Sequence, residues 1–398
     1  MAKTYKSRLK RNFKLFSAFM ALWGFAPYAL IAVLYFESLL NSYALAMSVF
    51  SIAFVSASAM EIPMGVMSDF IGRRKTMILG ALCCVAAVVF YIIPAHYREH
   101  TIFILFIGAF IQGTGQALIS GTDEAIIYET AQALGDKYEF KKYYSRGRSF
   151  QQAALGISAL LSGFIVYYTS YVYCYYVSLV SFGIWFIISF WWVEVETGDE
   201  RDNGNNIFAH IKEAVKLFKS SRKLQYLSIA NIIDDSSGLA LHRFEITYYQ
   251  ILIPEYLYGV PRMIKQMFGA VSFALSSKVI NKFTSAKTLL FSCVGMTIFK
   301  LISLIMNNFF TPFVAAVTNL FYGTTITAET DLLQKEFSDK QRATMRSLIG
   351  MCSSLMFGIL AVAIGYVADL TSPRTTLFYF LSLKIIIFSI YWKIYKLK

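Results

Sequence analysis

The feature that most constrains the fold of this chain is a series of about twelve apolar runs, each long enough to cross a bilayer. A helix rises ~1.5 Å per residue, so about 20 residues span a hydrocarbon core of ~30 Å. The runs lie at roughly 13–36, 42–67, 76–95, 102–131, 149–168, 171–193, 224–252, 265–281, 287–306, 312–335, 345–368 and 375–395. Hydrophobic residues make up 57% of the sequence, above the ~45–50% of a water-soluble domain. We therefore predict an all-α polytopic membrane protein.

The net charge of +13 reflects membrane topology rather than a nucleic-acid partner. Lys and Arg fall in short clusters between the apolar runs and form no continuous basic face. Short loops on the cytoplasmic side of a membrane collect these residues. The basic N-terminus precedes a run that is longer than the core of a signal peptide, so we expect a first spanning helix there. These patterns predict a multi-pass protein of the bacterial inner membrane with both termini in the cytoplasm.

The chain divides at its one long hydrophilic stretch, residues 194–223. Its TGDERDNGNN segment has the composition of a flexible linker, and Asn206 is the expected cap of an amphipathic helix on the membrane surface. Six apolar runs remain on each side, in domains 1–193 and 224–398. The sequence NKFTSAKT at 281–288 resembles DFIGRRKT at 69–76, which lies at the same place in the first half. We therefore expect two related six-helix halves.

A compact charged turn joins the second and third apolar runs, and it contains Gly65, Asp69, Gly72, Arg73 and Arg74. Gly72 suits a sharp turn, and Gly65 suits the close approach of a neighbouring helix. The carboxylate of Asp69 needs a positive partner at the end of a membrane helix. The basic residues beside an apolar helix place this turn on the cytoplasmic side.

The spacing of this turn, G-x-x-x-D-x-x-G-R-R-K, resembles the loop motif between the second and third helices of the major facilitator superfamily of secondary transporters. The resemblance implies about twelve transmembrane helices in two six-helix halves that work by alternating access. It also implies that the motif gates the cytoplasmic side and that Asp69 binds the opposite half. The SGTDEAIIYET segment of the fourth run resembles poorly characterised bacterial members that are often grouped with drug exporters.

Carboxylates within the apolar runs are the candidates for proton coupling. An ionisable residue at bilayer depth costs at least ~2.5–3.5 kcal/mol on insertion scales, so such residues usually serve a purpose. Adjacent acids at low dielectric cannot all ionise at low cost, and one of them is then able to carry a proton. The candidates are Asp123 and Glu124 in the fourth run, Asp234 and Asp235 in the seventh, and Glu61 in the second.

Candidates for substrate binding lie on the first, fourth, seventh and tenth runs, which the resemblance implies line the central cavity. Aromatic surface in the first run lies beside Pro27, which is expected to kink the helix. The full set is Trp23, Phe25, Tyr28, Gln112, Gln116, His242, Arg243, Glu245, Tyr249 and Glu329. The fourth run lacks the arginine of the family's RxxQG pattern, since Ala109 stands there, and Arg243 is a candidate for that missing positive charge.

We expect no enzymatic function, because the sequence contains no GxSxG, Walker or HExxH motif. The four histidines show no ligand spacing, so no metal and no cofactor are expected. Three functions remain open: proton-coupled export of a small amphipathic or cationic compound such as an antibiotic, proton-coupled uptake of a metabolite or siderophore, and a non-transporting receptor or immunity protein on a transporter fold. The expected partners are a small-molecule substrate, protons and membrane lipid, and the protein is expected to be a monomer.

Overall fold

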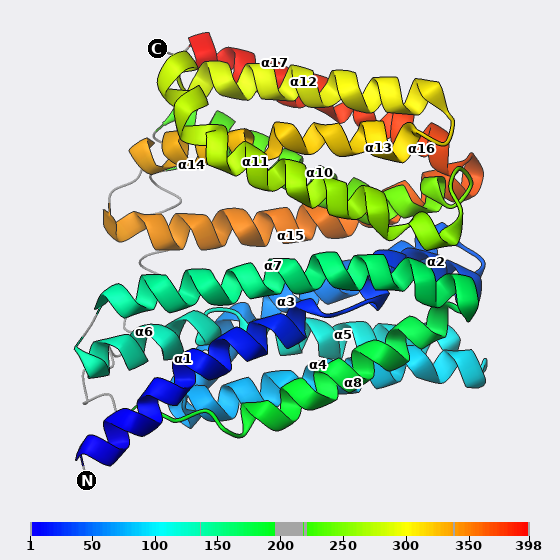
Figure 1. Cartoon of the computed structure of the whole chain (residues 1–398). Helices are drawn as coiled ribbons and strands as arrows, with labels where there is room; N and C mark the ends of the chain where they lie inside the picture. The colour runs from blue at the N-terminus through cyan, green and yellow to red at the C-terminus, as the bar shows by residue number, and fades with distance from the viewer. Residues whose placement is uncertain (1, 136, 196–217, 219–220, 337–338, 397–398) are drawn as a thin grey trace. The chain divides into compact units, whose positions relative to one another are not determined.

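The structure is a computed structural model that describes residues 2–135, 137–195, 218, 221–336 and 339–396. Every regular element in these ranges is helical, and they contain no β-strand, which confirms the predicted all-α fold. The chain forms two compact units (Figure 1). The first unit comprises residues 1–41 and 48–203, and the second comprises residues 42–47 and 204–398. The beginning of one helix, α3, thus belongs to the second unit while the rest of it belongs to the first.

The first unit is drawn mainly in blue to green in Figure 1. Its described helices are α1 (Ala2–Gly24), α2 (Tyr28–Leu40), α3 (Tyr43–Ile71), α4 (Arg73–His96), α5 (Thr101–Ile119), α6 (Thr122–Leu134), α7 (Lys137–Tyr168) and α8 (Tyr171–Ser189). Within this unit α4 packs along α5 and α8, and α1 packs along α7.

The second unit runs from yellow-green to red in Figure 1. Its described helices are α10 (Arg222–Tyr249), η1 (Glu255–Leu257), α11 (Gly259–Phe283), α12 (Ser285–Met306), α13 (Thr311–Ala316), η2 (Val317–Leu320), α14 (Tyr322–Glu336), α15 (Asp339–Leu370), α16 (Pro373–Leu381) and α17 (Leu383–Lys396). Here α10 packs against α14, α15 and α17, while α14 packs against α11 and α12. The expected interfacial helix that begins at Asn206 lies, apart from Phe218, outside the described residues.

Four of the predicted spans are interrupted rather than continuous, and the twelfth is divided into α16 and α17 at Ser382. The first breaks between α1 and α2, where Pro27 has no amide hydrogen to continue the helix, so the expected kink is a full break. The fourth breaks between α5 and α6 at Gly121, whose φ of +75° is left-handed and suits glycine. The tenth is divided into α13, η2 and α14. Interrupted membrane helices present free backbone groups at depth, which is common at transporter binding sites.

Nine helical stretches of the described chain are long and apolar enough to cross a membrane. The predicted spans that fall short are α10, α11 and the stretch from α13 to α14. Each contains charged residues, among them Asp234 on α10, Lys265 on α11 and Glu329 on α14. Large apolar side chains elsewhere on the helices are exposed, as for Phe103 at 66% and Ile359 at 67%, which is the surface that lipid requires. Charged residues within these three stretches therefore lower their hydropathy below that of the other nine.

Candidate functional site

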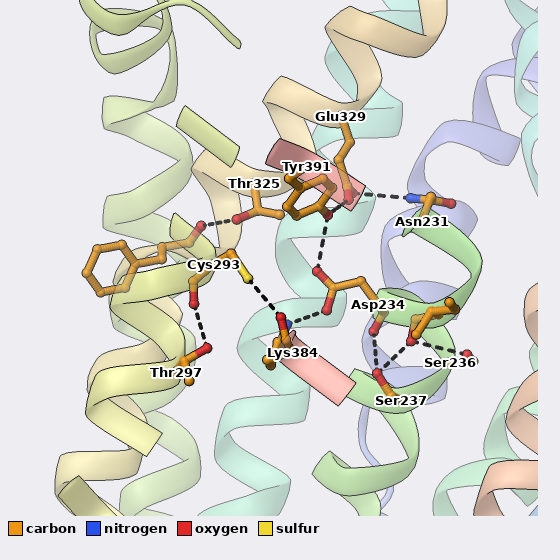
Figure 2. A network of polar contacts seen from close by, with 12 residues as sticks. Asn231, Asp234, Ser236, Ser237, Cys293, Thr297, Thr325, Glu329, Lys384 and Tyr391 are labelled. Carbon is orange, nitrogen blue, oxygen red and sulfur yellow. Dashed lines mark hydrogen bonds and ion pairs between the residues drawn. The ribbon is translucent and has the colours of Figure 1, made fainter. Parts of the chain in front are cut away.

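The second unit contains a buried network of charged side chains from α10, α14 and α17, shown in Figure 2. Lys384 forms an ion pair with Oδ1 of Asp234. The hydroxyl of Tyr391 donates a hydrogen bond to Oε1 of Glu329 and also lies 3.4 Å from Oδ2 of Asp234. The amide of Asn231 donates to Oε2 of Glu329 over 3.2 Å. These contacts join three helices that are far apart in sequence.

Helical spacing explains how these side chains meet. Asn231 and Asp234 are three residues apart on α10, so they lie on one face of that helix. Lys384 and Tyr391 are two turns apart on α17 and also share a face. The apolar cluster around them includes Leu227, Ala230, Ala328, Leu332 and Ile387, all of them buried. Apolar side chains therefore pack against much of this network.

Negative charge exceeds positive charge in this part of the second unit. Asp234, Asp235 and Glu329 supply three carboxylates, and Lys384 is the ammonium group that pairs with Asp234 in the described network. Glu329 is 4% exposed, whereas Asp235, which follows Asp234 on α10, is exposed. We call these three acids, with Lys384 and Tyr391, the acidic network. Ionising the buried Glu329 close to Asp234 is costly at low dielectric, and a proton-coupling role for Asp234 and Asp235 stays a prediction.

The other predicted acids lie in the first unit. Asp123 pairs with Arg148 over 3.0 Å, and Glu124 accepts a hydrogen bond from Tyr144 over 3.2 Å. Both acids stand in the first turn of α6, directly after the break at Gly121. Glu61 is exposed on α3. The two acidic pairs expected from the sequence therefore have different surroundings, since an arginine balances Asp123 and a lysine balances Asp234.

The charged turn between α3 and α4 forms a compact cluster of its own. Arg73 contacts Asp69 over 3.0 Å and Glu129 over 3.2 Å. Glu194 accepts the backbone N–H groups of both Arg73 and Arg74, each over 2.8 Å, and so caps α4. Gly72 has a φ of +92°, which confirms its predicted role in a sharp turn. The binding of Asp69 to the opposite half stays a prediction.

Gly65 does not have the close helix contact that we expected. It is exposed on α3, and no atom of the described chain lies within 4 Å of the place where a Cβ would stand. Small size is therefore not required at this position by packing within the described structure. A close approach of a helix within the same unit is therefore not seen, and an approach by a helix of the other unit stays a prediction.

The predicted substrate residues of the first unit gather around the break in its first span. The Tyr28 hydroxyl accepts a hydrogen bond of 2.9 Å from Nε2 of Gln112. Oε1 of the same glutamine accepts one of 2.7 Å from the Tyr91 hydroxyl. The ring of Trp23 stacks on Trp185 with centroids 6.2 Å apart. Two further candidates, Phe25 in the break and Gln116 on α5, are half-buried. The structure thus brings Tyr28 and Gln112 together, as their proposed shared role requires.

The predicted residues His242, Glu245 and Tyr249 lie near the end of α10, about two, three and four turns from Asp234. Glu245 forms ion pairs with Lys265 and Lys300, and Lys300 lies over the ring of Tyr249. Arg243 is half-buried on the same helix. Glu329, predicted to bind substrate, contacts Asn231 and Tyr391 in the acidic network, and its role in substrate binding stays a prediction.

Several residues of these clusters were not among the sequence candidates: Asn231, Tyr391, Arg148, Arg262, Lys265, Lys300 and Lys384. A signal for three of them was available, because Lys265, Lys300 and Lys384 lie within apolar runs. The insertion cost that singled out the acids applies equally to a lysine at the same depth. Tyr391 carries no such signal, since tyrosine is common in membrane helices.

The fold defines a polytopic helical transporter, and comparisons with known proteins agree. The sequence model of the major facilitator superfamily matches residues 15–361, so the chain belongs to that family. A mutant of the nucleoside transporter NupG is similar in structure, with a TM-score of 0.81, 15% identity, and coverage of 97% of this chain and 99% of its own.

Two further solved structures resemble the chain at similarly low identity. A D-xylose–proton symporter has a TM-score of 0.65 at 14% identity, with 96% of each chain covered. A bacterial homologue of the human lysosomal transporter Spinster has a TM-score of 0.72 at 13% identity, covering 98% of this chain and 97% of its own. No functionally curated protein matches the sequence. The likeness therefore establishes the transporter fold and not the substrate.

Proposed function

We propose that this protein is a proton-coupled secondary transporter and that the acidic network of the second unit carries the coupling proton. The observation that supports this most strongly is the set of contacts that link Asp234, Glu329 and Lys384 through the Tyr391 hydroxyl. One lysine balances one carboxylate, so a second acid has its charge uncompensated unless it holds a proton. A buried carboxyl that must be protonated to be stable is a natural carrier for proton coupling.

The tyrosine hydroxyl gives this network two arrangements. Tyr391 has one hydrogen to donate, and two carboxylates stand within reach of it. In the structure the hydrogen goes to Glu329. Protonation of Glu329 would free the Tyr391 hydroxyl to donate its hydrogen to Asp234, the carboxylate that also pairs with Lys384. A change of protonation at one helix is thereby passed to two others, which is the kind of event that alternating access needs.

The first candidate for transport direction is export of a small amphipathic or cationic compound in exchange for protons. Asp235 is the acid of the network that is exposed, so a cation or a proton reaches it most easily. Competition between the two for one site produces antiport. The remaining predicted acids, Asp123, Glu124 and Glu61, are secondary candidates for coupling under this proposal.

The second candidate is uptake by proton symport. It is favoured by the likeness to a D-xylose–proton symporter and to a nucleoside transporter, both of which share the fold over nearly the whole chain. In this case protonation of the acidic network would favour substrate binding instead of competing with it. The same residues serve both directions, so a transport measurement separates them.

The test uses membrane vesicles of both orientations prepared from cells that contain the full chain. Everted vesicles receive ethidium as the cationic amphipathic probe, and right-side-out vesicles receive labelled uridine and D-xylose. Export predicts ethidium accumulation that an uncoupler abolishes and that Glu329→Gln lacks. Glu255→Gln, on η1 outside the network, is the matched control and should behave as wild type. Uncoupler-sensitive uptake of uridine or D-xylose would favour symport, and transport that ignores the uncoupler would refute proton coupling.

A further inference from the structure

A second charged cluster of the second unit lies apart from the acidic network and has the opposite balance of charge. Glu245 is held by two ammonium groups, with Lys300 2.5 Å from its Oε1 and Lys265 2.9 Å from its Oε2. His242 lies beside it, and its Nδ1 is 3.0 Å from both Lys265 Nζ and Arg262 Nη1. We call these five residues the basic cluster.

Three helix ends meet at this cluster. His242 and Glu245 are three residues apart near the end of α10, and Arg262 and Lys265 are three residues apart in the first two turns of α11. Lys300 comes from the last two turns of α12. Asp234 and Glu245 are about three turns or ~16 Å apart, so they share one face of α10. The acidic network and the basic cluster therefore lie one after the other along α10.

The basic cluster contains more positive charge than its one carboxylate neutralises. The two lysines already occupy both oxygens of Glu245, and Arg262 adds a third cation. The side chains of Glu245, Lys300 and Lys265 are only 11%, 12% and 15% exposed. His242 adds no compensating negative charge, because an imidazole is either neutral or positive, and its Nδ1 faces both Arg262 and Lys265. Excess charge at this depth is costly unless an anion or water compensates it.

Arg262 has donors to spare for such an anion. Within the described chain its one hydrogen bond goes to His242, and a guanidinium carries five N–H donors. Lys265 also competes with Arg262 for the single acceptor atom of that histidine. A planar guanidinium matches the two oxygens of a carboxylate or phosphate, and the adjacent ammonium group adds charge. A purely structural ion pair for Glu245 would need neither the arginine nor the second lysine.

We propose that the basic cluster binds an anionic group, a carboxylate or a phosphate, on the small molecule that this protein transports. This inference rests on the proposed transport function and adds to it a chemical class for the substrate. An amphipathic substrate with an acidic group would use the basic cluster for that group, while the acidic network handles the proton. The two sites would then divide the charges of the transport cycle between them.

The test measures binding by the purified full chain in neutral detergent, without any gradient. Thermal unfolding is followed with benzoate, phenylphosphate and benzylamine, which share a ring and differ in charge. Benzoate or phenylphosphate should stabilise the wild type, and Arg262→Gln should weaken that binding about tenfold, as expected for a lost charge-assisted hydrogen bond. This substitution leaves both lysines on Glu245. Lys278→Gln removes an exposed charge from the same helix and should bind as wild type.

A second variant and a measurement with lipid complete the test. Arg262→Lys keeps the positive charge but loses the planar guanidinium, so it should weaken benzoate binding less than Arg262→Gln does. It is also the variant to measure if Arg262→Gln fails to fold. Stabilisation by benzylamine alone would overturn the proposal, as would equal anion binding by wild type and Arg262→Gln. Stabilisation by phosphatidylglycerol micelles but by neither free anion would assign the site to lipid and also overturn it. Since no gradient is present, these results are independent of the vesicle test of proton coupling.

Discussion

Arg148 Nη2 lies 3.0 Å from Oδ2 of Asp123, and this ion pair joins α7 to the first turn of α6. The side chain of Asp123 is 4% exposed, whereas that of Arg148 is 36% exposed. The acid therefore depends on the arginine for compensation far more than the arginine depends on the acid. Such a pair is costly to break from one side only, because the buried charge is then left alone.

We predict that Arg148→Gln lowers the free energy of unfolding by about 2 kcal/mol, since Asp123 becomes an unpaired buried acid. Asp123→Asn should cost less, because the half-exposed arginine returns to water. The double substitution should recover much of the loss, which is the mark of a coupled pair. Thermal unfolding of the purified protein gives all three values. Strictly additive effects would show that the pair contributes nothing.

The start of α4 provides a second prediction. Glu194 accepts the N–H groups of Arg73 and Arg74, and a Cβ on Gly72 would stand 2.9 Å from its Oε1. Gly72→Ala combines a left-handed φ with this clash, so it should destabilise the protein by about 2 kcal/mol. Glu194→Ala removes the cap alone and should cost about 1 kcal/mol.

The matched control for this glycine is Gly156 on α7, where no described atom lies within 4 Å of an added Cβ. Gly156→Ala should be neutral or slightly stabilising, because alanine is favoured over glycine within a helix by about 1 kcal/mol. Both variants are compared by thermal unfolding in the same detergent. If Gly72→Ala is as stable as Gly156→Ala, neither the positive φ of Gly72 nor its closeness to Glu194 has energetic weight.

The breaks in the helices show what sequence reasoning reaches and where it stops. Pro27 pointed to an irregularity in the first span because a proline lacks the amide hydrogen that a helix requires. Gly121 gave no such sign, because glycine is also common in continuous membrane helices, and its φ of +75° is visible only in the structure. The helical class itself followed from run length, which the membrane thickness dictates.

The acidic network shows how far the functional site can be predicted from the sequence. Asp234 was identified because a carboxylate in an apolar run is costly, and the same reasoning applied to Lys384 would have identified its cation. No sequence pattern pairs the two, since they are 150 positions apart and meet only through the packing of α10 on α17. Residue identity thus indicates which groups need a partner, while tertiary packing decides which partner they obtain.

The charge pattern of the loops gives a topological prediction. Tags at either terminus and in the 199–205 segment should lie on the cytoplasmic side, where loops collect Lys and Arg. They should therefore all be accessible in everted vesicles and protected in intact cells. Protease digestion or impermeant labelling measures this directly. A tag reached from outside intact cells would require a different assignment of the spans.

The last prediction concerns Lys384, the cation of the acidic network. Lys384→Gln removes the ammonium group from three clustered carboxylates, so it should lower the free energy of unfolding by about 3 kcal/mol. Adding Asp234→Asn should restore most of that loss, because the number of uncompensated charges returns to its original value. Lys393→Gln, an exposed lysine on the same helix, is the control and should change stability by less than about 0.5 kcal/mol. If the double variant is no more stable than Lys384→Gln, then Asp234 is not the acid that this lysine compensates. In that case Lys384 compensates Asp235 or Glu329, and Asp234 becomes the candidate for the proton-carrying role.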